Sequence, residues 1–201
     1  MPDTGAPYFI PFADPTNLVR DWPALSEDVA EQVALGLDAA GNAGIGSNVV
    51  QTVKTNTFST TSTSPTNVTG LSVTITPTSA SSKVLLLATL QVGAGNGNIA
   101  QSVFVRFTGG NSATFVGDAS GSRNRAVHFG TSGNEDFIPW RMGVPVNPTF
   151  LDAPNTTDPV TYQMQIWVNT SIGYVGRSAF DTNSTQMART PSSLIAIEVA
   201  A

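Results

Sequence analysis

Hydrophobic and polar residues alternate with a period of two along most of the chain after residue 49, as in half-buried β-strands. Turns rich in Gly, Pro, Ser and Asn separate these segments. About eight to ten short strands with no helix between them predict an all-β, jelly-roll-like sandwich of roughly 150 residues. The predicted strands are 52–60, 67–76, 83–92, 100–108, 160–169 and 193–199, with weaker candidates at 113–116, 125–129, 135–143 and 171–180.

Two segments depart from simple alternation. Residues 83–92 (KVLLLATLQV) are almost continuously apolar, which predicts a central strand buried on both faces. Residues 147–159 are polar and contain three prolines, which predicts a long loop.

The aromatic residues of this part are the candidates for binding contacts. Tyr162 and Trp167 lie at opposite parity, so one is expected to face the core and the other to face outward or a subunit contact. Core packing is the default for most aromatic residues. Phe150, in PTFLDAPN, and Tyr174, in SIGYVGR, are the predicted exposed contacts for a receptor.

Residues 26–40 carry the one helical pattern that we recognise. Ser26 is a suitable N-cap, and Glu27 and Asp28 place negative charge in the first turn. So short a helix is unstable alone, so its narrow apolar seam needs a partner surface. That surface is either the β domain of the same chain or copies of the same helix in a bundle. The seam consists of Val29, Val33 and Leu37.

The first 25 residues form a Pro-rich leader that interleaves five prolines with large aromatic side chains. An extended peptide of this kind is suited to docking on the surface of another protein; the alternative is that it folds back on its own β domain. Residues 41–48, GNAGIGSN, follow the helix and are rich in glycine, which predicts a flexible hinge. The predicted organisation is leader 1–25, helix 26–40, hinge 41–48 and β domain 49–201.

Charge is distributed unevenly. Residues 1–48 carry seven carboxylates and one arginine, a balance of −6, whereas residues 49–201 carry eight basic and seven acidic residues, a balance of +1. The absence of a basic patch argues against nucleic-acid binding. No apolar run approaches the roughly 18 residues needed to cross a bilayer, so no membrane insertion is expected.

The sequence offers no convincing catalytic or metal-binding constellation. It has no cysteine, and its single histidine, His128, lies in an alternating run where chance placement on a strand explains it. Glu135 and Asp136 are adjacent, so on a strand they point to opposite faces. No Cys/His cluster fits zinc. We therefore expect no enzyme activity, no cofactor and no bound metal.

Two parts of the chain resemble tail fibre proteins of tailed bacteriophages. Residues 8–33 resemble the virion-attachment segment of those fibres, in which an extended aromatic–Pro stretch is followed by V-R-D-W/Y-P-A and a short helix. Residues 58–86 and 192–200 resemble runs in the fibre knob domains. The matching leader positions are Tyr8, Pro11, Val19, Arg20, Asp21, Trp22, Pro23 and Ala24.

The resemblance implies a homotrimeric virion protein that is made in the host cytoplasm. Its N-terminus would anchor to a tail or baseplate protein, and its β knob would contact a host surface glycan or outer-membrane component. Trp22 is expected to fill a pocket of that virion protein, and Arg20 to pair with its oxygen atoms. The residues expected to dock on the virion are Tyr8, Phe9, Phe12, Arg20, Asp21, Trp22 and Pro23.

Two other functions fit the same sequence. One is a purely structural virion decoration, collar or baseplate component without a receptor of its own. The other is a polysaccharide-degrading tailspike enzyme, which is less expected because the β domain is short and shows no solenoid repeat.

Overall fold

The computed structural model describes residues 29–33, 45–95, 101–132 and 143–200. The predicted leader contacts, Leu37 and the Glu135–Asp136 pair lie outside these residues. Residues 29–33 are helical, as predicted. Val33 in this helix is 48% exposed.

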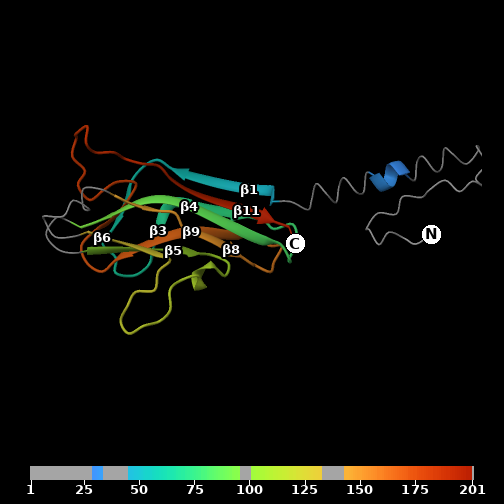
Figure 1. Cartoon of the computed structure of the whole chain (residues 1–201), viewed down its shortest axis with the longest axis horizontal. Helices are drawn as coiled ribbons and strands as arrows, with labels where there is room; N and C mark the ends of the chain where they lie inside the picture. Colours follow the sequence, from blue (N-terminus) through green and yellow to red (C-terminus); the bar gives the residue numbers. More distant parts are fainter. Residues whose placement is uncertain (1–28, 34–44, 96–100, 133–142, 201) are drawn as a thin grey trace, which may run out of the picture.

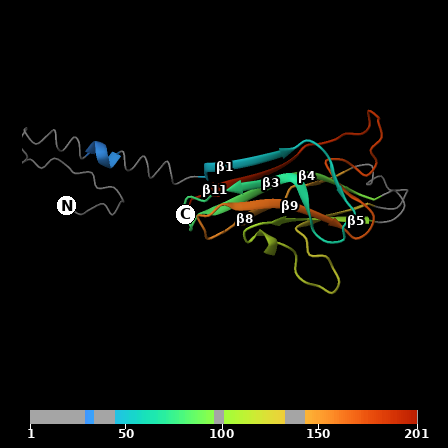
Figure 2. The ribbon, with the colours of Figure 1, turned by 180° about the vertical axis from the view of Figure 1, so that it is seen from behind.

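The described β domain consists of two antiparallel sheets, which face each other in Figures 1 and 2. The larger has seven strands, with β7 and β8 added beside β4 to the order β1-β11-β4-β10-β2, and the smaller has the order β3-β9-β5-β6. The strands are β1 Ile45–Lys54, β2 Phe58–Thr60, β3 Thr66–Ile75, β4 Lys83–Ala94, β5 Gln101–Thr108, β6 His128–Ser132, β7 Val144–Val146, β8 Thr149–Asp152, β9 Val160–Val168, β10 Gly173–Val175 and β11 Ser192–Val199.

The strand pairing is nested from the ends of the domain inward. The first main strand pairs with the last, β1 with β11, and the next pair is β3 with β9. Then β4 pairs with β7 and β8, and β5 pairs with β6. A long antiparallel hairpin wrapped into two sheets has this connectivity, which is that of a jelly roll. The predicted fold class is therefore confirmed.

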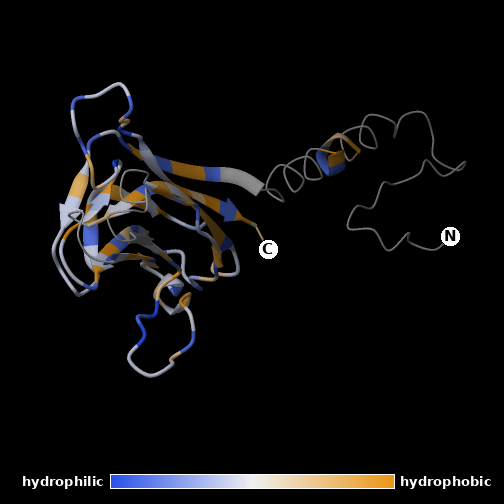
Figure 3. Ribbon diagram, turned by 60° about the vertical axis from the view of Figure 1, so that its left-hand side comes forward, coloured by the Kyte–Doolittle hydropathy of each residue, from blue (hydrophilic) through white to orange (hydrophobic). Residues whose placement is uncertain are grey.

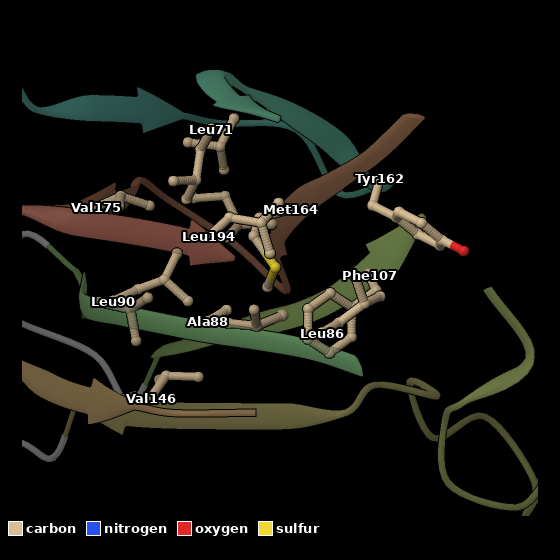
Figure 4. Close-up of a cluster of buried hydrophobic side chains, with 14 of the residues drawn as sticks. Leu71, Leu86, Ala88, Leu90, Phe107, Val146, Tyr162, Met164, Val175 and Leu194 are labelled. Atoms are coloured by element: carbon tan, nitrogen blue, oxygen red, sulfur yellow. The ribbon is translucent and has the colours of Figure 1, made fainter. Parts of the chain in front are cut away.

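Alternate residues of both sheets fill the space between them. Figure 4 shows Leu86 and Leu90 of β4 opposite Met164 of β9, with Phe107 of β5 beside them. All four side chains are at most 1% exposed. Their strict period of two explains why the alternating segments form strands: only that period places every second side chain on the buried face.

The structure corrects four sequence-based expectations. The region 147–159, predicted as a loop, contains strand β8, which pairs with β4. Residues 112–114 form a short 3₁₀ helix, which overlaps the weaker strand candidate 113–116. Strand β1 begins at Ile45, inside the predicted hinge 41–48, because it pairs with the end of β11. Strand β4 is central, as predicted, but its outward side chains, such as Leu85, are only half-buried.

Glu198 is a buried carboxylate near the end of β11, with an exposed fraction of 0%. Its Oε1 accepts hydrogen bonds from the Thr78 hydroxyl (2.6 Å) and the Thr78 backbone N–H (2.7 Å). Its Oε2 accepts one from the Asn48 amide at 3.2 Å. Burial by itself would raise the pKa of Glu198, but these hydrogen bonds outweigh burial and lower the pKa to about 2.

We expect Glu198→Gln to lower the free energy of unfolding at pH 7 by about 1–3 kcal/mol, because charge-assisted hydrogen bonds are lost. In the unfolded chain the pKa of this glutamate is about 4.5, so the ionised carboxylate contributes its full stability to the folded protein above about pH 4.5. This contribution is lost as pH falls toward about 2, the pKa in the folded protein. Urea unfolding of both proteins across this range should show their difference shrinking. A difference that is constant with pH would contradict the account, and Asp158→Asn, at an exposed loop carboxylate, is the control.

Candidate functional site

Three aromatic side chains form a row across the outer face of the smaller sheet. Phe104 of β5 lies in register with Phe129 of β6 on one side and with Trp167 of β9 on the other. The ring centroids of Phe104 and Phe129 are 6.3 Å apart, and those of Phe104 and Trp167 are 5.4 Å apart and stacked. We call Phe104, Phe129 and Trp167 the aromatic row.

Exposure increases along the aromatic row toward the edge strand. Trp167 is 3% exposed, Phe104 is half-buried and Phe129 is 60% exposed. Trp167 is covered in part by the loop before β6, where the Asn124 side-chain oxygen accepts a hydrogen bond from the indole N–H at 3.0 Å. The row is therefore anchored at Trp167 and open at Phe129.

Polar groups continue the same face beside the aromatic row. The Arg106 guanidinium lies over the Trp167 ring, 5.8 Å from its centroid, and its Nε–H donates to the Gln165 side-chain oxygen at 2.8 Å. The Gln165 amide in turn donates to the Asn67 side-chain oxygen at 2.7 Å. These hydrogen bonds fix the orientation of the Asn67 and Gln165 amides and of the Arg106 guanidinium on the outer face of the sheet.

The loop that covers Trp167 adds positive charge near the row. Arg123 and Arg125 flank Asn124 in this loop and are exposed. Figure 3 shows the loop as a mainly hydrophilic projection at the bottom of the view. With Arg106, three of the eight basic residues of 49–201 therefore belong to this face or to its covering loop.

Flat aromatic rings beside ordered amides match the chemistry of sugars. The C–H face of a pyranose ring is apolar and packs on an aromatic ring, and its hydroxyl groups pair with amide and guanidinium groups. Phe129 lies on β6, the edge strand of this sheet among the described residues, and supplies a ring that is 60% exposed. The group therefore offers both a stacking surface and oriented hydrogen-bonding groups to a ligand.

The predicted contacts lie elsewhere. Tyr174, expected to be exposed, is 9% exposed in β10, and the Arg177 guanidinium lies over its ring at 3.8 Å. Phe150 lies in β8 rather than in a loop and packs against the core, with its ring stacked on Phe115 at 4.5 Å. Pairing with β4 draws β8 and β10 into the larger sheet, so Tyr174 is buried and Phe150 is half-buried rather than exposed.

Only one feature of the sequence pointed to the aromatic row: the alternation along β9, which places Tyr162 and Trp167 on opposite faces of the sheet. Tyr162 is 0% exposed and faces the core, so Trp167, at opposite parity, faces outward, as the sequence predicted. The sequence did not indicate Phe104 or Phe129, because only the register of three strands that are distant in sequence brings them beside Trp167.

Other places in the described residues are less suited to a ligand. A hollow of about 410 Å³ lies within the loop 181–189. Its carboxylate, Asp181, is already paired with Arg189 at 2.7 Å and with Arg177 at 3.3 Å. Within the described part of the chain, no group of three or more His, Cys, Asp or Glu residues is placed to hold a metal ion. None of the described helical residues belongs to a helix long and apolar enough to cross a membrane.

No protein-family model matches this chain, and no curated protein matches it by sequence. Solved structures with similar β structure include the VP2 subviral particle of infectious bursal disease virus, with 12% identity over 76% of this chain and 37% of that chain, and a TM-score of 0.33. T=1 particles derived from the same virus match with 11% identity over 78% of this chain and 37% of theirs, also at a TM-score of 0.33. This chain thus spans less than two fifths of the length of those chains, and its assignment as a jelly roll rests on its own strand pairing.

Proposed function

We propose that this protein is a non-enzymatic virion structural protein: a short homotrimeric tail fibre whose leader anchors it to the tail or baseplate and whose β knob attaches to the host surface. The resemblance of residues 8–33 to fibre attachment segments supports the anchoring role. All the net negative charge of the chain lies in residues 1–48, which supports separate functions for the two ends: anchoring at the N-terminal end and attachment at the β knob. The jelly-roll knob supplies a rigid platform for surface contacts.

The observation that carries host attachment is the aromatic row with its ordered amides. The partner that fits this row is a surface polysaccharide, with Phe129 as the ring on which a sugar stacks. Arg106, Arg123 and Arg125 favour sugars that carry acidic groups, such as uronic acids or phosphorylated core sugars. Attachment through this face would leave the larger sheet free for other contacts.

Phe129→Ala is expected to weaken binding of the full-length protein to bacterial surface polysaccharides by about tenfold, because removing one stacked ring costs roughly 1.4 kcal/mol. Binding would be measured on an array of lipopolysaccharides and capsular polysaccharides, both acidic and neutral. Phe129 is 60% exposed, so the fold should be unaffected.

Phe115→Ala is the matched control, because it removes another partly exposed phenylalanine, 37% exposed, that lies outside the aromatic row. It should bind as the wild type does. Equal binding by wild type and Phe129→Ala, or no binding to any bacterial surface polysaccharide, would contradict attachment through this row.

A second function is a virion decoration, collar or baseplate component that binds no receptor. One observation favours it: Trp167 is almost fully buried and its N–H is already paired, as in ordinary packing. The same array distinguishes the two, since a purely structural component gives no signal that depends on Phe129.

A further inference from the structure

The outer face of the larger sheet carries a continuous row of aliphatic side chains across four strands. Leu151 of β8 is in register with Leu85 of β4, Leu85 with Ile197 of β11, and Ile197 with Val49 of β1. The inward neighbours of these residues belong to the core, so parity places all four on the opposite side of the sheet.

Further aliphatic residues extend this row along the strands. Leu87 and Ile195 are in register in the next row, and Val199 is in register with Lys83 at the other end. We call the whole set the aliphatic face; it comprises Val49, Val53, Leu85, Leu87, Leu151, Ile195, Ile197 and Val199. Figure 3 shows hydrophobic bands along the strand that joins the N-terminal trace, which is β1.

The aliphatic face is open to solvent in the single chain. Val49 is 53% exposed, Val53 54% and Leu151 46%, and the remaining members are half-buried by one another. The outer face of an antiparallel sheet is ordinarily polar. On the smaller sheet, Thr74 of β3 and Thr161 of β9 are examples of such outward polar residues. Four strands about 4.8 Å apart and about 20 Å long give the aliphatic face roughly 400 Å². The largest apolar patch of a typical monomer has about this size and is often functional.

The charge of the aliphatic face selects among its possible occupants. Its polar neighbours in register, Gln51, Thr89, Thr149 and Ser193, are uncharged, and Lys83 is the one charged residue in register with it. The chain's own N-terminal region carries a balance of −6 and finds no matching positive surface here. A second copy of the same face is apolar and brings a single positive charge, Lys83 at the start of β4, so the two faces match in chemistry over most of their area.

The position of the aliphatic face also favours another copy of this chain. Val49 lies four residues after the start of β1 and twelve residues after Leu37, the last residue of the helical seam. Copies joined through the helix seam, one of the two partners expected for it, would also hold their β domains close together through this short connection. Three aliphatic faces that converge on a threefold axis each bury themselves against the two neighbouring copies, whereas a face-to-face pair would give a dimer.

We propose that the aliphatic face is the contact surface between the β domains of neighbouring copies of this chain. The number of copies, three, rests on the proposed function, whereas the location of the contact rests on the face itself. About 400 Å² per copy is half of the roughly 800 Å² per partner in a standard interface, so the assembly needs further contact area beyond the aliphatic face. Strand β4, whose sequence predicts burial on both faces, becomes doubly buried in this assembly.

Val49→Asp combined with Leu151→Asp tests the proposal on the full-length chain. Both side chains are about half exposed, so the fold should be retained, which circular dichroism would verify. Sedimentation equilibrium should give three times the chain mass for the wild type. The double variant should need at least a tenfold higher concentration to associate, because like charges then face each other.

Thr69→Asp with Thr74→Asp, two exposed positions of β3 on the smaller sheet, is the matched control and should associate as the wild type does.

A cross-linking experiment makes the test independent of the stability of that variant. Because the chain contains no cysteine, Val49→Cys provides a single thiol, and a short bis-maleimide should join copies through it. Thr74→Cys should not cross-link. If the double variant associates as the wild type does and Val49→Cys does not cross-link, the proposal is overturned. The chain could then still be a trimer, but its contacts would lie on another surface. A monomeric wild type would overturn both this contact and the trimer, whereas the polysaccharide array tests attachment separately.

Discussion

Gly109→Ala is expected to lower the free energy of unfolding by more than about 3 kcal/mol, a large part of the stability of a typical domain. Gly109 follows β5 with φ of +105°, a conformation that side-chain-bearing residues rarely adopt. An added Cβ would also overlap the backbone carbonyl of Thr161 in β9. Because the obstacle is backbone, the turn or the strand must move. Urea unfolding and thermal denaturation would measure the loss.

Gly121→Ala is the matched control for this prediction. Gly121 also has a positive φ, +57°, but an added Cβ would meet no atom within 4 Å. The substitution therefore carries only the conformational cost of a left-handed residue, about 1 kcal/mol. Similar losses for the two variants would show that the clash with Thr161 is relieved at little cost, contrary to the prediction.

Asp152→Ala is expected to cost about 2–4 kcal/mol of unfolding free energy, because it removes the acceptor for the buried Tyr162 hydroxyl and for a partly buried backbone N–H. The Tyr162 hydroxyl donates to Asp152 Oδ2 at 2.7 Å, and the Asn111 backbone N–H donates to the same oxygen at 3.2 Å. Asp152 is 1% exposed and Tyr162 0%. Figure 4 shows the Tyr162 hydroxyl pointing away from the hydrophobic cluster.

Tyr162→Phe completes a double-mutant cycle with Asp152→Ala. It removes one donor and leaves the ring in the core, so its cost should be smaller, about 1–2 kcal/mol. The double variant should cost less than the sum of the single variants, because the hydroxyl and the carboxylate are each other's partners. Strict additivity in urea unfolding would show that the hydrogen bond contributes no coupling.

The same pair predicts the behaviour of the protein at alkaline pH. Burial raises the pKa of Tyr162, and the hydrogen bond and the charge of Asp152 raise it further. The unfolded chain releases this proton near pH 10.0, whereas the folded protein retains it. The stability contributed by the protonated phenol is therefore complete below pH 10 and is lost as pH rises above it. In the Tyr162→Phe variant, the free energy of unfolding should no longer show this part of its decrease above pH 10.

The sequence was most informative where side-chain periodicity decides structure. Residues 160–169 were predicted as a strand, and β9 occupies Val160–Val168. Its alternation also separated Tyr162, in the core, from Trp167, on the outer face. The helical residues 29–33 likewise agree with a prediction made from capping and charge. These features depend on neighbours within one element, so the local pattern contains them.

The aromatic row was not predictable in the same way. Phe104 and Phe129 are separated by 25 positions, and Trp167 lies 38 positions further on. Their stacking depends on the register of β5 with both β6 and β9, which is decided by long-range hydrogen bonds. Phe150 and Tyr174 were expected to be exposed for the same reason: only pairing with β4 brings their segments into the larger sheet.

By itself the sequence determined that this chain has a helical segment followed by an all-β domain, because period and composition set the type of each element. It also indicated that residues 83–92 form a strand with two apolar faces. Only the tertiary structure decided the nested jelly-roll pairing, the aromatic row, and which face of β4 meets the core. The sandwich supplies a partner sheet to one face of β4 and leaves Leu85 and Leu87 on the other, because two sheets enclose a single interior.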